Sequence, residues 1–313
     1  MSYGHFGILL RELRESRNLT REQLAHNICT PKQIYRIEKG EYEPSLFLLN
    51  KLSIKFNMDL NEYYKMYFSN RSILAFEGVE KINKAISSND IKQVANLVNK
   101  YKDNKDFMEG ENLQHIYYGH ALCASLLEQN YHQSIEYCMK GIYIENPQFT
   151  IETIKDYTYS NVGITLINCI SRNYFTLNQA EIGIKILKDL LYVLDYYVFN
   201  SPYPINQSSD FTKKIYQTIL YNLCLYLLDT DDKRSALSYA NKGIEFSIKE
   251  NNIRFLPDLL FIKFRLLYHL SNIPESKICY IQAKNLLEIT GQNIKLQELE
   301  QTVIKEYPKL LEN

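Results

Sequence analysis

Residues 16–45 read SRNLTREQLAHNICTPKQIYRIEKGEYEPS, and this stretch contains two helix start signals. Thr20 can cap a short helix over residues 21–27, with a glutamine three residues on as its capping-box partner. Thr30 can cap a second helix whose first position is Pro31, where the missing N–H costs nothing. Two short helices joined by a tight turn are the geometry that enters the major groove of DNA.

Apolar spacing on both sides extends this pair to a larger domain. Ahead of it, apolar residues at positions 6, 9, 10 and 13 fall on one face of a first helix. After it, leucines at 46, 49 and 52 with Phe56 form the apolar face of a fourth helix, and a fifth begins near Leu60. The spacing predicts a compact five-helix domain over residues 1–66.

The outer surface of the third helix carries the candidate DNA contacts. Lys and Arg donate to guanine edges and Gln can bond adenine bidentately, so we expect Lys32, Gln33 and Arg36 to read bases. We expect Arg14, Arg21 and Lys39 to contact phosphates. The predicted DNA-binding set is completed by Gln23, Thr30 and Tyr35. The alternative is a merely solvated helix face, but seven basic against four acidic residues in the first 40 favour DNA.

Composition limits what the whole chain can be. The 313 residues are 45% hydrophobic, and 36 Lys and Arg balance 36 Asp and Glu, so any DNA affinity must be local. The six cysteines show no CxxC and no zinc spacing, which predicts reduced thiols and neither metal nor cofactor. Without a leader-like start or a run long enough to span a membrane, we expect a cytoplasmic protein with no membrane partner.

From about residue 72 the sequence is one amphipathic helix after another, which predicts an all-α fold. SIEYCMKGIYIE, from Ser134, and ALSYANKGIEFS, from Ala236, match at tyrosine, lysine, glycine and isoleucine positions and lie 102 residues apart, three times 34. Thirty-four residues is the tetratricopeptide period. We therefore predict that residues 67–313 form a right-handed superhelix of degenerate tetratricopeptide repeats, with a concave surface suited to an extended peptide.

Polar residues inside apolar stretches mark the predicted inner helices. Asn is a poor mid-helix residue, yet Asn161 and Asn222 can donate and accept at once, as a peptide backbone requires. The other candidate peptide contacts are Gln114, Tyr118, Tyr226 and Lys263. From the residues alone, hydrogen bonds within the core or with solvent explain the presence of these polar side chains equally well. Residues 197–210, rich in Pro, Ser and Asn, predict the longest non-helical segment.

The N-terminal pattern resembles the XRE/Cro-type helix-turn-helix family in LREL-RESRNLTREQLA, in IYRIEKGEYEPS and in the leucine spacing that follows. Two departures are Arg21, where the family usually has Gln, and a turn, NICT, that is one residue shorter. With repeats behind it, the whole chain resembles the RNPP family of peptide-pheromone receptors. The resemblance implies a homodimer that binds a palindromic double-stranded DNA site and responds to a short signalling peptide, held by asparagines on inner helices. It leaves activation and repression both open.

Other function classes have weaker support. No Ser/His/Asp spacing, Gly-rich phosphate loop or HExxH is present, so we expect no enzyme and assign no catalytic residue. Two alternatives to a peptide-controlled regulator are a repeat protein that binds response regulators and an adaptor whose N-terminal domain only dimerises.

Overall fold

The structure is a computed structural model that describes residues 5–61, 63–64, 73–200 and 210–311. Within these ranges the regular elements are all helices. The chain divides into two compact units, residues 1–128 and 129–313, which are described separately. Across the described ranges, no helix is long and apolar enough to cross a membrane.

The first unit begins with four short helices that match the predicted N-terminal pattern. They are α1 (Phe6–Ser16), α2 (Arg21–Ala25), α3 (Pro31–Glu38) and α4 (Leu46–Phe56). Residues 60–61 and 63–64 are also helical, and the remainder of the predicted fifth helix lies outside the described residues. The unit continues with α6 (Ile73–Ser87), α7 (Ile91–Tyr101), a 3-10 turn (Lys105–Phe107) and α8 (Gly110–Leu126).

The two predicted helix starts form as capping boxes. Thr20 Oγ1 accepts from the Gln23 backbone N at 3.2 Å, and Gln23 Oε1 accepts from the Thr20 backbone N at 2.8 Å. Thr30 and Gln33 repeat the arrangement at 3.2 and 3.0 Å. α2 is shorter than predicted and ends at Ala25, because Asn27 adopts a left-handed φ of 61° that a continuing helix does not allow.

Two separate hydrophobic clusters lie in the first unit. One is built from residues between Phe6 and Leu60, with Leu10, Leu24, Ile34, Leu52 and Phe56 fully buried. The other is built from residues between Ala75 and Cys123. The predicted boundary at residues 66 and 67 falls among residues that the structure does not describe, so it stays a prediction.

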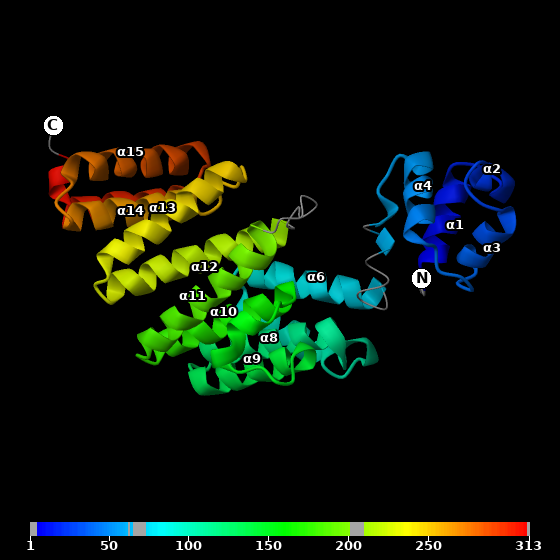
Figure 1. The fold of residues 1–313 in the computed structure, drawn as a ribbon, viewed down its shortest axis with the longest axis horizontal. Helices are drawn as coiled ribbons and strands as arrows, with labels where there is room; N and C mark the ends of the chain where they lie inside the picture. Colours follow the sequence, from blue (N-terminus) through cyan, green and yellow to red (C-terminus); the bar gives the residue numbers. More distant parts are fainter. Residues whose placement is uncertain (1–4, 62, 65–72, 201–209, 312–313) are drawn as a thin grey trace. The chain divides into compact units, whose positions relative to one another are not determined.

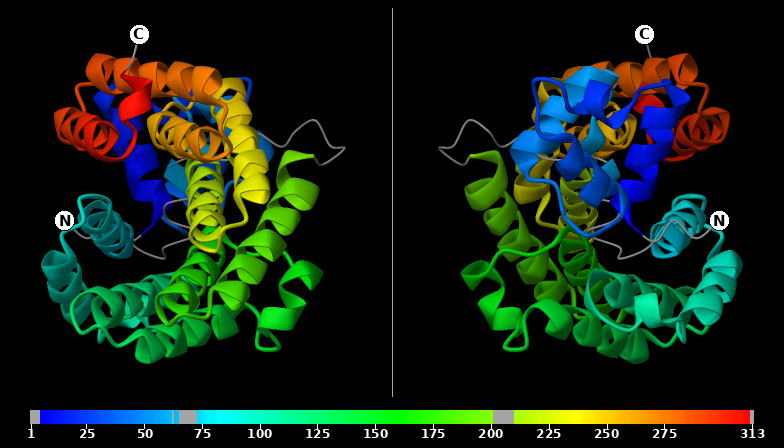
Figure 2. Two further views of the ribbon diagram at one scale, coloured as in Figure 1. Left: turned by 90° about the vertical axis from the view of Figure 1, so that its left-hand side faces the viewer. Right: turned by 90° about the vertical axis from the view of Figure 1, so that its right-hand side faces the viewer.

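The second unit is a series of helix pairs, coloured green to red in Figure 1. Its helices are α9 (Tyr131–Glu145), α10 (Asn161–Thr176), α11 (Ala180–Leu194), α12 (Asp210–Asp229), α13 (Lys233–Lys249), α14 (Leu256–His269), α15 (Ile273–Ile289) and α16 (Asn293–Glu306). Short 3-10 turns cover Ile151–Asp156 and Pro308–Leu310, and a π-helix covers Asp195–Phe199. Figure 2 shows the helix axes turning from one pair to the next.

Within this unit each helix packs on the next, and α12 also contacts both α10 and α14. We name these three helices the inner layer, because first helices of successive pairs meet on the inside of a superhelical bend. The prediction of a non-helical segment over residues 197–210 is wrong at its start. There Asn200 N donates to Asp195 O at 2.8 Å and extends α11 by one wide turn, while residues 201–209 lie outside the described residues.

Gly7 sets how closely α1 approaches the end of α3. A Cβ built on Gly7 would lie 1.7 Å from the carbonyl oxygen of Ile37, a backbone atom that cannot move aside on its own. Only glycine fits at this crossing, so the orientation of α3 depends on residue 7.

We expect Gly7→Ala to destabilise the N-terminal helices by about 1–3 kcal/mol, because overpacking a close helix contact forces the backbone apart. Urea unfolding followed by circular dichroism measures the change, with Glu12→Ala, an exposed substitution on the same helix, as the control. Equal stability of the two variants would show that the crossing is not tightly packed.

Candidate DNA-binding surface and peptide groove

α3 presents its basic side chains outward. Its buried positions are Ile34, Ile37 and Glu38, whereas the exposed positions are Lys32, Tyr35, Arg36 and Lys39 at its C-cap, as the helical spacing predicts. The Tyr35 ring lies between two cations, with the Arg21 guanidinium carbon 5.3 Å and Lys39 Nζ 5.9 Å from its centroid. The structure therefore gathers Arg21, Tyr35 and Lys39 on one surface.

A buried carboxylate holds this surface to the rest of the domain. Glu38, with a side chain only 1% exposed, accepts from Arg14 Nε at 2.6 Å and from Arg21 Nε at 2.7 Å. Arg14 Nη1 also donates to the Leu19 carbonyl at 2.9 Å, which closes the turn between α1 and α2. Glu38 raises the pKa of Arg14 above its usual value, against the lowering effect of burial. The network thus joins α1, α2 and α3.

This network corrects one predicted DNA contact. Arg14 is 7% exposed and its guanidinium is occupied by Glu38 and Leu19, so it braces the domain instead of meeting phosphate. The sequence contained a signal for this burial, since residue 14 follows Leu10 by four and Phe6 by eight on the buried face of α1. Arg21 keeps a side chain 37% exposed and remains a candidate phosphate contact.

The capping glutamines have restricted chemistry. The Gln33 Oε1 atom accepts from the Thr30 backbone, so bidentate reading of adenine would require the cap to open. Its side-chain NH2 group can donate to DNA with the cap intact, and Gln23 is placed in the same way. Thr30 uses its hydroxyl in the cap. Sequence reasoning missed Lys55, whose Nζ reaches the Gln23 carbonyl and fixes the far end of α2.

The inner layer of the second unit brings both predicted asparagines together with two partners. Asn161 Oδ1 on α10 accepts from Thr212 Oγ1 on α12 at 3.0 Å. Asn222 Nδ2 on α12 donates to Asn168 Oδ1 on α10 at 3.3 Å. These side chains bridge the two inner helices. Asn161 is the first residue of α10 and not a mid-helix residue, so its predicted helical cost does not arise.

A row of polar residues on α10 supplies the α10 side of both bridges. Residues 161, 165, 168 and 172 are Asn, Thr, Asn and Arg and follow one another at helical spacing of four, three and four. We name these four residues the α10 stripe. Of these four residues, sequence reasoning selected only Asn161, although the seven-residue spacing from Asn161 to Asn168 would have marked the second amide.

Three other candidates do not face a ligand as predicted. Tyr226 is 5% exposed, and its ring stacks on that of Phe175 with the centroids 3.9 Å apart, so Tyr226 is a core residue. Burial raises the pKa of its hydroxyl to about 12. Lys263 points to the outer helix α15, with its Nζ 3.4 Å from Glu275. Gln114 on α8, in the first unit, is 2% exposed. Tyr118, also on α8, is half-buried.

A cavity of about 490 Å³ adjoins the inner layer. Its walls include Tyr221 of α12 and Phe261 of α14, and Lys295 of α16 forms an ion pair with Asp258 at 2.8 Å. Sequence reasoning missed these aromatic residues, because tyrosine and phenylalanine occur throughout the repeats and only the fold shows which of them border a cavity.

The N-terminal helices and the fold of the whole chain both have matches among known proteins. Residues 10–63 match the helix-turn-helix family. No curated protein matches the chain. Bacillus thuringiensis PlcR, solved with the peptide PapR7 and DNA, has a similar fold, with a TM-score of 0.74, 20% identity and coverage of 95% of this chain and 99% of PlcR.

Two further solved structures are similar over almost their whole length. The SHP pheromone receptor Rgg2 of Streptococcus dysgalactiae gives a TM-score of 0.63 at 14% identity, covering 96% of this chain and all of Rgg2 at 100%. ComR from S. thermophilus, in complex with DNA and its signalling peptide ComS, gives 0.56 at 15% identity, with 96% and 98% covered. These matches confirm the predicted all-α fold, a helix-turn-helix domain followed by a superhelix of tetratricopeptide-like repeats.

We expect Glu38→Ala to destabilise the packing of α3 by about 3 kcal/mol, because it leaves the Arg14 guanidinium buried without its carboxylate. Hydrogen exchange of the α3 amides, read by mass spectrometry, measures the loss. Glu41→Ala, an exposed substitution three residues on, is the matched control. Unchanged protection of α3 in Glu38→Ala would contradict the bracing role.

Residues 10–63, which include α3, thus match the helix-turn-helix family, and the chain as a whole has the fold of the PlcR, Rgg2 and ComR structures.

Proposed function

We propose that this protein is a cytoplasmic transcription regulator of the RNPP type, which binds promoter DNA as a homodimer and is controlled by a short signalling peptide. The observation that carries the proposal is the presence, in one chain, of an exposed basic α3 and of an inner layer bridged by side-chain amides. The first supplies an output on DNA, and the second supplies an input from a ligand.

The DNA-binding half rests on the charge and rigidity of α3. Lys32, Arg36 and Lys39 are exposed on it, and the capped N-terminus of the helix adds backbone N–H groups suited to phosphate. The Arg36 guanidinium carbon lies 5.5 Å from the centroid of the Tyr42 ring, a contact that limits the rotamers of Arg36 in the absence of DNA. A helix this short reads only a few base pairs, so a second copy on a palindromic half-site supplies the rest of the specificity.

The peptide-binding half rests on the amides of the inner layer. In the Asn168–Asn222 bond each side chain uses only one of its groups, and neither side chain makes another hydrogen bond in the described parts of the chain. Asn168 Nδ2 and Asn222 Oδ1 thus offer one donor and one acceptor. The backbone of an extended peptide has a C=O acceptor and an N–H donor that can bond to them. Both residues are half-buried, which strengthens such bonds relative to bulk water.

The similar structures support this assignment through their own ligands. PlcR was solved with a peptide and DNA, and ComR with DNA and its signalling peptide. Both share the two-part fold of this chain over nearly its full length. We carry over the class of ligand, and not any contact residue, from these relatives.

Arg36→Ala should cost about 1–3 kcal/mol at a specific DNA site if Arg36 reads a base, and it should relax the preference at one position of that site. The site is first selected from random duplexes with the wild-type chain, and affinities are then measured at fixed salt. Lys51→Ala on α4, a basic residue outside α3, is the control. A site preference identical to that of the wild type would remove Arg36 from the base-reading set.

Asn168→Ala and Asn222→Ala should each weaken peptide binding about tenfold, because each removes one hydrogen bond and leaves a peptide group unsatisfied. Short synthetic peptides selected from a random library on the wild-type chain serve as ligands, and calorimetry gives the affinities. Gln282→Ala, an exposed amide on α15, is the control. If both inner-layer variants bind the selected peptides like the wild type, the groove lies elsewhere.

A further inference from the structure

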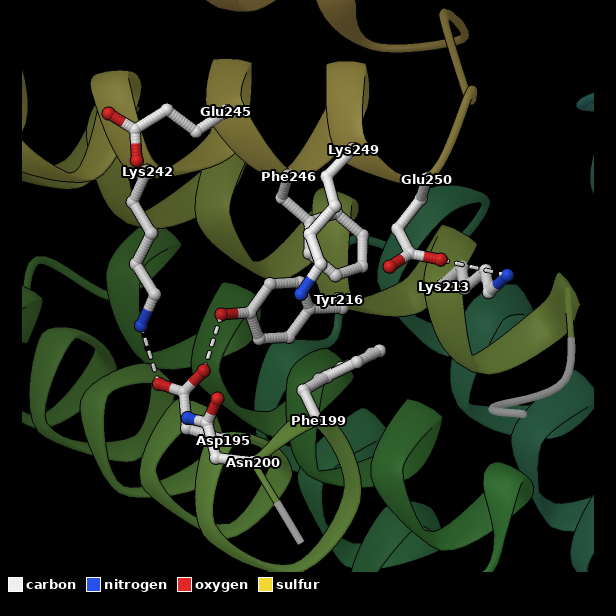
Figure 3. Close-up of a pocket in the computed structure, with 10 residues that line it drawn as sticks. All are labelled: Asp195, Phe199, Asn200, Lys213, Tyr216, Lys242, Glu245, Phe246, Lys249 and Glu250. Atoms are coloured by element: carbon white, nitrogen blue, oxygen red, sulfur yellow. Dashed lines mark hydrogen bonds and ion pairs between the residues drawn. The ribbon is translucent and has the colours of Figure 1, made fainter. Parts of the chain in front are cut away.

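A second cavity, of about 530 Å³, lies on the second unit away from the amide pairs. It is bounded by the π-helix Asp195–Phe199, by the first half of α12 and by the last half of α13 (Figure 3). This volume is within the range of about 300–1,000 Å³ typical of small-molecule sites. π-helical turns are rare and occur frequently at functional sites.

The floor of the cavity is aromatic. The Tyr216 ring centroid lies 4.5 Å from that of Phe199 and 4.5 Å from that of Phe246, and the two phenylalanine rings are 4.9 Å apart. Tyr216 is 2% exposed, so its ring is fixed in place and supports the half-buried rings of Phe199 and Phe246, which a ligand can reach. In Figure 3 the three rings meet at the centre of the site. Such a floor favours a flat apolar group, which can stack on a ring or meet its edge.

The charges at the two ends of the cavity are already neutralised. At one end Asp195 accepts from the Tyr216 hydroxyl at 2.5 Å and pairs with Lys242 at 2.5 Å. Burial is the main cause that raises the pKa of Tyr216, and the hydrogen bond to Asp195 is the second. The hydroxyl therefore stays protonated and donates. At the other end Lys213 pairs with Glu250 at 2.9 Å. These pairs leave neither end available as a strong charge for a ligand.

Lys249 differs from the other two lysines. It is exposed, and the described residues include no carboxylate within ion-pair distance of it. Figure 3 shows its side chain running across the rings, with the ammonium group beside Tyr216, whereas Glu245 points away from them. The cavity therefore combines an aromatic floor with the ammonium group of Lys249, which pairs with no carboxylate among the described residues.

The cavity is separate from the inner-layer amides. Lys213 precedes Asn222 by nine residues on α12, which places the two side chains about half a turn apart, on opposite sides of the helix. On α13 the lining residues 242, 246 and 249 recur at spacings of four and three and so share one face. A ligand held there would leave the Asn168–Asn222 bond untouched.

We propose that this cavity is a second ligand site that binds a small planar aromatic anion, packed against the half-buried rings of Phe199 and Phe246 with its acidic group on Lys249. The flat group matches the two accessible phenylalanine rings, and the negative charge matches an ammonium group that no described carboxylate pairs with. This proposal does not depend on the peptide groove.

The test uses 2-naphthoate as the probe and 2-naphthalenemethanol as its uncharged counterpart, with calorimetry on the full-length chain. We expect naphthoate to bind about fivefold more tightly than the alcohol, and Lys249→Gln to remove this difference. Phe246→Leu, which keeps an apolar side chain of similar size, should weaken both compounds. Lys214→Gln, an exposed lysine outside the cavity, and Asn222→Ala should bind naphthoate like the wild type.

The outcomes are separable. No detectable binding of either compound, or equal binding of the acid and the alcohol, would overturn the proposal. So would an unchanged naphthoate affinity in Lys249→Gln. Loss of naphthoate binding in Asn222→Ala with retention in Lys249→Gln would place the probe in the inner layer instead. Circular dichroism of each variant shows whether the fold is intact, and Lys249→Gln alters only an exposed side chain.

Discussion

The buried carboxylate of Glu38 is the interaction on which the DNA-binding half depends. It accepts from Arg14 on α1 and Arg21 on α2 while it lies itself at the end of α3, so one charged group fixes three helices. Buried ions survive in proteins when they are paired and hydrogen-bonded, and breaking such a set is costly. The orientation of the basic surface, and hence any reading of DNA, follows from this network and from the close approach at Gly7.

The helices of the second unit are held together by a different kind of interaction. Their inner helices are joined by neutral amide and hydroxyl bonds between α10 and α12, which are individually weak and leave hydrogen-bonding groups available. In the proposed function, a bound peptide would replace these bonds with bonds to its own backbone at a small free-energy cost. The proposed function requires a rigid basic surface for DNA and an adjustable polar surface for a ligand, and the chain has one surface of each kind.

Sequence patterns predicted the helices better than the side-chain partners. The Thr-x-x-Gln spacings at 20 and 30 specify local capping boxes, so both helix starts were predictable from neighbouring residues. Arg14 was assigned to phosphate because its partner Glu38 is 24 residues away, and only the packed domain brings them together. Asn161 was found but Asn168 was not, since its role appears only when α12 lies beside α10. The π-helix at Asp195–Phe199, with the sequence DYYVF, carries no recognisable signal, and its last three residues fall inside the predicted non-helical segment 197–210.

In the proposed function, peptide binding and DNA binding are coupled. The most direct measurement of this coupling is the affinity of the chain for its selected DNA site with and without a selected peptide. By linkage, the peptide must change DNA affinity by the same factor by which DNA changes peptide affinity. The proposed coupling predicts equal factors of about fivefold or more in the two directions. Affinities for DNA and peptide that are each independent of the other ligand would contradict it.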